Sequence, residues 1–321
     1  MRELTDEFMW DLRDVDGRLY PLLKRIKQDH TLMLSIRKDY INIYYRGGSI
    51  LKLEKLNDGY CPYFNPKYNK LNIPIPRNKR TIRNINDTDV WLNAFRDLKR
   101  LMDSYYSGYF INSSSNPERE FQQLIARENN YSTLSRISEY FITDIEFEDT
   151  DIGARLDILA LQWLSTHRKK IDRFRPVFIE MKYGDDALKE HSGLIEHLED
   201  VDELISDNEK YQSLCKTMEI QFNQLDKLGL MKFKKVANWK DIEVNREEIP
   251  EVICILSNHN PRSKILGKIL NDPSFDKFAN SPKYELKFHI SSFSGYALHA
   301  DCMVSLEKFR KLVNINYMTP K

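Results

Sequence analysis

The chain has 321 residues and a formal net charge of +1, with 30% charged and 41% hydrophobic residues. This balance is typical of a soluble globular protein, and a near-neutral total argues against a protein that coats nucleic acid indiscriminately. No apolar stretch approaches the roughly 18 residues of a membrane span, and residues 1–11 are acidic and polar, so we expect neither a membrane anchor nor a signal peptide.

The first part of the chain predicts a small α+β extension, which we place at residues 1–112. Two neighbouring glycines, Gly47 and Gly48, are a two-residue hairpin signal between strands. A loop is expected over 59–86 because that segment contains four prolines. The expected regular elements, in chain order, are a helix at 3–28, strands at Leu32–Arg37, Tyr40–Arg46 and Ser49–Lys55, and a helix at Asp87–Ser107.

A second domain is predicted at residues 113–321. The segment Ser113–Pro117 marks its start, because proline suits the first turn of a helix. The expected elements are a helix at Pro117–Glu128, strands at Ile137–Glu146, Ala154–Gln162 and Val177–Lys182, a long helix at Asp186–Ile205, a further helical stretch, a strand at Val252–Leu256, a helix at Ser263–Leu270 and a strand at Tyr284–Ser291. The chain is therefore predicted to be a mixed α/β (α+β) protein.

Charged residues interrupt two of these apolar strands. Asp157 lies in the middle of the run Gly153–Leu161, and Glu180 and Lys182 lie near the end of the run Pro176–Gly184. Burying a carboxylate is costly unless it is paired or binds a metal ion. If the two strands pair antiparallel, Asp157 lies opposite or diagonal to Glu180, and a divalent cation between the two acids would relieve their repulsion.

Asp157, 22 intervening residues and then Glu180-Met181-Lys182 resemble the motif of the PD-(D/E)XK nuclease superfamily, over roughly residues 115–295. Leu156 stands where the motif has its proline. The resemblance implies a restriction-endonuclease-like core, a central mixed β-sheet flanked by helices. It also implies that Asp157, Glu180 and the Met181 carbonyl bind Mg²⁺, with Mn²⁺ as a substitute, while Lys182 lies by the attacking water.

Two alternatives qualify this prediction. The spacing Glu-x-Lys recurs as Glu285-Leu286-Lys287, although no acid-bearing strand precedes that copy. The acids at 157 and 180 could also form a buried ion pair with Lys182 and take no part in catalysis. Many family members place a further acid in the helix before the three strands, and Glu120 occupies that position here. A solvated acid in the first turn of a helix explains Glu120 equally well.

Three further features suggest contacts with nucleic acid. The loop after Gly59 has cations alternating with aromatic rings, although a solvated, proline-stiffened loop has the same composition. The connection between the two motif strands is also basic, which is common at a hairpin tip, and His191 lies on the apolar side of the following helix, where a buried structural histidine is the alternative. The candidate contacts are Lys67, Lys70, Arg77, Lys79, Arg80, Arg168, Lys169, Lys170 and His191.

The sequence therefore predicts a metal-dependent nuclease that hydrolyses phosphodiester bonds. DNA is the preferred substrate only because most members of the family act on it. The alternative is a nucleic-acid-binding module that keeps the fold but does not cut, and a homodimer is left open. Four cysteines without a C-x-x-C pair predict free thiols and a cytoplasmic protein.

Overall fold

A computed structural model describes residues 2–78, 80–107, 117–149, 153–168, 173–184, 188, 193–235, 239–257, 264–289, 298 and 300–315. The fold is mixed α/β, as predicted, with a four-stranded antiparallel sheet and a six-stranded mixed sheet. The chain forms two compact units, Met1–Arg127 with Asn223–Lys232, and Glu128–Phe222 with Phe233–Lys321. The predicted domain boundary at 112 and 113 lies outside the described residues.

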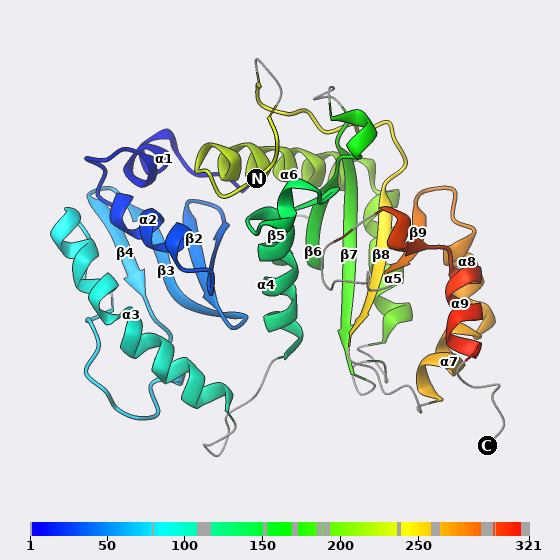
Figure 1. Ribbon diagram of the computed structural model, residues 1–321, viewed down its shortest axis with the longest axis horizontal. Coiled ribbons are helices and arrows are strands. Elements are labelled where there is room, and N and C mark those ends of the chain that lie inside the picture. Colours follow the sequence, from blue (N-terminus) through cyan, green and yellow to red (C-terminus); the bar gives the residue numbers. More distant parts are fainter. Residues whose placement is uncertain are drawn as a thin grey trace. The chain divides into compact units, whose positions relative to one another are not determined.

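The first unit contains the four-stranded sheet and helices that lie on one side of it (Figure 1). Its strands, hydrogen-bonded in chain order, are β1 (Leu32–Ile36), β2 (Tyr40–Tyr45), β3 (Gly48–Leu56) and β4 (Gly59–Tyr63). Its helices are α1 (Asp6–Arg13), α2 (Tyr20–Gln28) and α3 (Ile85–Tyr106). The core is formed by apolar side chains that alternate along the strands and recur every three or four residues along the helices, as the periods of the two structures require.

Three local predictions for this unit need correction. The expected helix at 3–28 is two helices, because the chain turns so tightly that a Cβ on Gly17 would lie 2.4 Å from the Asp11 carbonyl oxygen. The expected loop at 59–86 begins with strand β4. The turn between β2 and β3 is centred on Arg46 and Gly47 with φ of 49° and 73°, and Gly48 already belongs to β3. Both central residues of such a hairpin turn have positive φ.

The second unit contains the six-stranded sheet, in the order β10-β9-β8-β7-β6-β5. Its strands are β5 (Tyr140–Asp149), β6 (Ala154–Gln162), β7 (Arg175–Tyr183), β8 (Glu251–Ser257), β9 (Glu285–His289) and β10 (Met303–Val304). The first three pair antiparallel, β7 pairs parallel with β8 and β8 with β9, and β10 is antiparallel to β9. The prediction for β6 is confirmed at both ends, and β7 is two residues longer at its start and one at its end than predicted.

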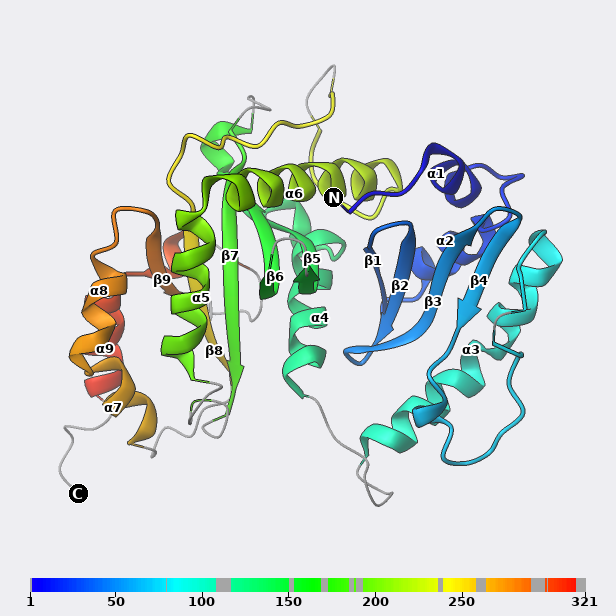
Figure 2. The ribbon, with the colours of Figure 1, turned by 180° about the vertical axis from the view of Figure 1, so that it is seen from behind.

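Helices flank this sheet. The remaining helices are α4 (Pro117–Asn130), whose residues up to Arg127 belong to the first unit, α5 (Leu194–Ser206), α6 (Asn208–Lys227), α7 (Ile265–Leu270), α8 (Asp276–Ala279) and α9 (Leu306–Ile315). Figure 2 shows α5 and the first part of α6 lying over the face formed by β6, β7 and β8. The buried residues of α5 are Leu194, Leu198, Val201 and Leu204, a stripe at helical spacing. Residues 186, 187 and 189–192 of the predicted long helix lie outside the described residues, and α5 begins at Leu194.

Two contacts join elements of the second unit. At the C-terminal end of α4, the Asn130 amide donates to the Ile142 carbonyl at 2.7 Å and its carbonyl oxygen accepts from the Ile142 amide at 2.8 Å. Trp163 stacks on Phe174, with ring centroids 4.8 Å apart.

No helix among the described residues is long and apolar enough to cross a membrane.

Candidate active site

The antiparallel pairing of β6 with β7 brings the two motif acids together. The paired residues end with Ile158 opposite Ile179, so Asp157 and Glu180 are the next residues on the two strands. The backbone N–H of Met181 donates to Oδ2 of Asp157 at 2.8 Å. The two carboxylates therefore occupy neighbouring positions across the strand pair, as the sequence predicts from the alternation of side chains. The predicted separation of about 5 Å between them stays a prediction.

Glu180 is the most enclosed charged residue of the site, with 2% of its side chain exposed. Lys182 lies two residues further along β7, and its Nζ is 2.8 Å from Oε1 of Glu180. A second nitrogen approaches the same oxygen, because Nδ1 of His197 on α5 lies 3.1 Å from Oε1. His197 is a site residue that the sequence pattern did not predict. No motif marks it, because its place depends on how α5 packs over the strands.

Burial and a neighbouring negative charge raise the pKa of Asp157 from 3.8 to about 7. The largest cause is burial, which disfavours the charged carboxylate, and the second is the negative charge of Glu180. The Met181 amide and the Lys182 ammonium act in the opposite direction and are outweighed. Burial and the Lys182 charge lower the pKa of His197. A cation is therefore favourable beside Asp157, and the histidine is poorly suited to supply it.

A third carboxylate, Glu146, contributes to the high pKa of Asp157. It lies on β5 between Ile145 and Phe147, which pair with Ile158 and Leu156, so its position is opposite Asp157. Its φ is 50°, a left-handed conformation that non-glycine residues rarely adopt and that costs about 1–2 kcal/mol. The sequence analysis missed Glu146 because this strand carries several acids at its end and nothing in the pattern distinguishes one of them.

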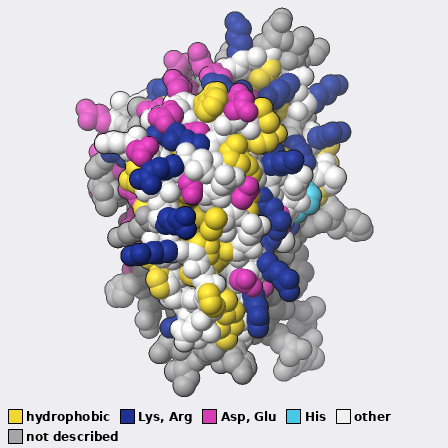
Figure 3. Space-filling view, turned by 90° about the vertical axis from the view of Figure 1, so that its left-hand side faces the viewer, with side chains coloured by type: hydrophobic (Ala, Val, Ile, Leu, Met, Phe, Trp, Pro, Cys, Tyr) yellow, Lys and Arg dark blue, Asp and Glu magenta, His cyan; other side chains and the backbone are white. Residues whose placement is uncertain are grey.

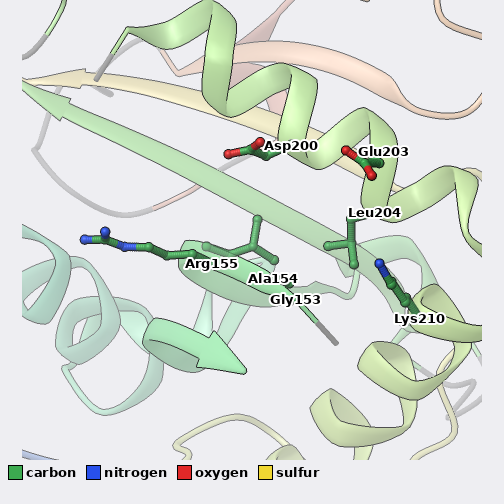
Figure 4. Close-up of a pocket in the computed structure, with 8 residues that line it drawn as sticks. Gly153, Ala154, Arg155, Asp200, Glu203, Leu204 and Lys210 are labelled. Carbon is green, nitrogen blue, oxygen red and sulfur yellow. The ribbon is translucent and has the colours of Figure 1, made fainter. Parts of the chain in front are cut away.

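A small pocket of about 170 Å³ lies next to this centre, at the N-terminal end of β6. Figure 4 shows Arg155 from β6, Asp200 and Glu203 from α5 and Lys210 from α6 around it. Arg155 is exposed and two residues from Asp157, so both side chains leave the strand on the same face. A cationic side chain therefore lies on the same face of β6 as the motif acid.

Glu120 lies in the first unit, in a cluster of its own. Arg46 bridges two acids there, with Nε 3.1 Å from Oε1 of Glu120 and Nη1 3.0 Å from Oδ1 of Asp103. The hydroxyl of Tyr45 donates to the same Asp103 at 3.0 Å. These contacts give Glu120 a structural partner, and its role as a catalytic acid or metal ligand stays a prediction.

The predicted nucleic-acid contacts are placed unevenly. Four of them are exposed, namely Lys67, Lys70, Arg77 and Arg80. Four others lie outside the described residues, namely Lys79, Lys169, Lys170 and His191. Three of the four rings expected to stack on bases, Tyr60, Phe64 and Tyr68, are at most 5% exposed, and the fourth, Tyr63, is partly exposed. Figure 3 views the side of the first unit on which α3 is drawn and shows basic side chains spread over it, with acidic ones among them.

Arg168 is engaged within the protein. Its guanidinium carbon lies 4.6 Å from the ring centroid of Trp163 and 5.4 Å from that of Phe141. Its Nη2 donates to the Ser138 carbonyl oxygen. These contacts favour a structural role for Arg168 over the predicted contact with a phosphate.

Comparison with known proteins gives no relative from which a function could be transferred. No family, no curated protein and no solved structure matches the chain. Within the part of the chain that the structure describes, no group of three or more His, Cys, Asp or Glu side chains is arranged to hold a metal ion.

Proposed function

We propose that the second unit is a metal-dependent nuclease with a restriction-endonuclease-like core. The observation that carries the proposal is the position of Asp157 and Glu180 directly after the last paired residues of β6 and β7, together with the pKa of Asp157, raised to about 7. Groups whose pKa is strongly shifted by burial and by a neighbouring charge gather at functional sites. DNA is the preferred substrate, on the basis of the family resemblance.

The chain topology supports this core. A helix, three antiparallel strands, helices and then a strand parallel to the third strand follow one another as α4, β5, β6, β7, α5, α6 and β8. This is the order that the resemblance implies. The acids and the lysine lie on the second and third of these strands, where the motif has them.

The donor set fits a hard divalent cation such as Mg²⁺. Asp157 and Glu180 offer carboxylate oxygens, the ligands that Mg²⁺ prefers, and the Met181 carbonyl is the third expected ligand. Because Mg²⁺ commonly retains several waters and binds substrate phosphate, two carboxylates and one carbonyl are enough. A cation bound there would lower the pKa of a bound water and neutralise charge on a phosphodiester.

The other charged residues have separate roles. Lys182, held against Glu180 in this state, would hold the attacking water and offset charge on the phosphate once the acids take up a cation. Arg155, exposed and two residues from Asp157, would bind a phosphate beside the scissile one. Glu146 would maintain the negative charge of the site from β5.

A binding module that does not cut is the second candidate. The ion pair between Glu180 and Lys182 at 2.8 Å favours this candidate, because the two side chains neutralise each other without a metal ion. Incubation of the protein with supercoiled plasmid and Mg²⁺ or Mn²⁺, with and without chelator, separates the two. The nuclease predicts chelator-sensitive nicking that the Asp157→Asn protein lacks. Plasmid binding with no cleavage in either metal would contradict the nuclease and support the module.

A further inference from the structure

His197 is placed on Glu180 by the way α5 packs. The residues on either side along the helix face, Leu194, Leu198 and Val201, are buried against the sheet. His197 lies between them, with its side chain 25% exposed, and its Nδ1 is the atom that faces Oε1 of Glu180. An imidazole anchored on a packed helix has few conformations available, so its approach to Oε1 restricts the carboxylate more than a flexible lysine chain can, and Oε1 accepts no hydrogen bond from the described residues in this state.

Two nitrogens therefore approach one oxygen of Glu180. Lys182 and His197 lie 2.8 Å and 3.1 Å from Oε1. In the proposed reaction Lys182 is needed at the attacking water, so it has to leave Glu180. His197 is on a different element and has no such second task. It would then be the group that continues to hold the carboxylate.

We propose that His197 is a positioning residue, which holds Glu180 through Nδ1 in the orientation that binds a divalent cation next to Asp157. The inference rests on the proposed function, since it assigns the cation to these two acids. Outer-shell partners of this kind orient metal-binding side chains, and their loss commonly weakens metal binding ~10–100-fold.

Three substitutions and a control test the proposal. Asparagine can place its amide nitrogen close to the position of Nδ1, glutamine places it closer to that of Nε2, and leucine removes the donor. The control is Glu199→Gln on the same helix, whose partner is Lys277 of α8 at 2.6 Å. Mn²⁺ binding to each full-length protein is measured by titration calorimetry without nucleic acid, and the melting temperature is measured without metal.

We expect Mn²⁺ affinity to fall in the order wild type, His197→Asn, His197→Gln and His197→Leu. The His197→Leu protein should bind ~10–100-fold more weakly than wild type, and the Glu199→Gln control should bind like wild type. If His197→Leu does not fold, the difference between the Asn and Gln variants decides. If all His197 variants bind Mn²⁺ with the affinity of the wild type, the inference is overturned, whether or not their melting temperatures are lower. Absence of Mn²⁺ binding in the wild type would instead remove the proposed metal centre, and the inference with it.

Discussion

Two charged clusters on the same sheet contain the spacing Glu-x-Lys, and their surroundings differ. The first is Glu180 and Lys182 on β7, next to Asp157. The second includes Glu285 and Lys287 on β9 and is centred on Glu251 of β8, which is fully buried. The partners of Glu251 are Tyr140 at 2.9 Å, Gln162 at 2.9 Å, Arg175 at 2.9 Å and Lys287.

The difference lies in the ion pairs of the central acid. Arg175 and Lys287 each contact both Glu251 and Glu285, and Arg175 also lies 4.0 Å from Glu248. Within the described residues Asp157 forms no ion pair, and the charges of Glu180 and Glu146 raise its pKa while the charge of Lys182 lowers it. The Glu251 cluster is complete as it stands, whereas the Asp157 cluster favours an additional cation. The motif spacing alone does not distinguish a structural ion-pair cluster from a candidate metal site.

The largest expected effect concerns the stability of the Glu251 cluster. Replacing Glu251 by Ala leaves Arg175 and Lys287 without their central acid, and removing one partner of a buried ion pair typically costs about 3–5 kcal/mol, so we expect a loss of that size. Urea unfolding followed by circular dichroism measures it. Glu199→Gln, an exposed ion-pair partner, is the matched control, and an equal small loss in both proteins would show that the cluster is not structural.

Plasmid cleavage should depend on the Asp157 cluster and not on the Glu251 cluster. Asp157→Asn and Glu180→Gln should each reduce metal-dependent plasmid cleavage by at least ~10²-fold, as is common for groups that stabilise charge in a transition state. Glu285→Gln, in the other copy of the spacing, should cleave like wild type. Initial rates of nicking at saturating Mg²⁺ provide the comparison. A similar loss in Glu285→Gln would end the distinction between the two clusters.

The pH dependence of stability sharpens the comparison further. The pKa of Asp157 is raised in the folded state, from 3.8 to about 7, so the folded protein binds this proton more tightly than the unfolded chain. The contribution of Asp157 to the free energy of unfolding is therefore fully present below pH 3.8. It is lost as the pH rises to about 7, and the loss is ~4 kcal/mol at most. Asp157→Asn should not show this loss. Parallel curves of unfolding free energy for the two proteins between pH 4 and 7, measured without metal, would contradict the raised pKa.

A smaller effect is expected from Arg155. Replacing it by Gln removes one phosphate contact, so KM should rise several-fold and the slope of log affinity against log salt should fall by about one. Mn²⁺ affinity should not change, since Arg155 is not expected to touch the cation. Arg136→Gln, another exposed arginine of this unit, is the control. Equal KM values for the Arg155→Gln and Arg136→Gln proteins would show that Arg155 does not bind the substrate.

Local sequence patterns predicted most of this architecture. Alternation and length placed β6 at its observed bounds and β7 within two residues, and antiparallel pairing then put Asp157 beside Glu180. The rule that an acid in an apolar strand indicates a site also applies to Asp144, which is fully buried and accepts a hydrogen bond from Gln221 at 2.9 Å. Asp144 and Asp157 differ in the residues that contact them from other helices and strands.

The missed site residues have the same cause. His197 reaches Glu180 because of the packing of α5, and Glu146 lies opposite Asp157 because of the register of β5. Neither tertiary packing nor register is encoded in a short motif. The aromatic residues of the 59–86 segment were misjudged for a related reason, because β4 carries Tyr60 into the core, where its hydroxyl donates to Asp11 at 2.6 Å.

The most direct test of the central claim is the effect of metal on thermal stability. A cation that binds only the folded state stabilises it by ~2.7 kcal/mol at a hundred times its dissociation constant, which for a chain of this length raises Tm by a few degrees. Differential scanning calorimetry with and without millimolar Mg²⁺ should show this rise for the wild type and for Glu285→Gln, and none for Asp157→Asn. An equal rise in all three proteins would place the cation elsewhere and contradict a metal centre at Asp157 and Glu180.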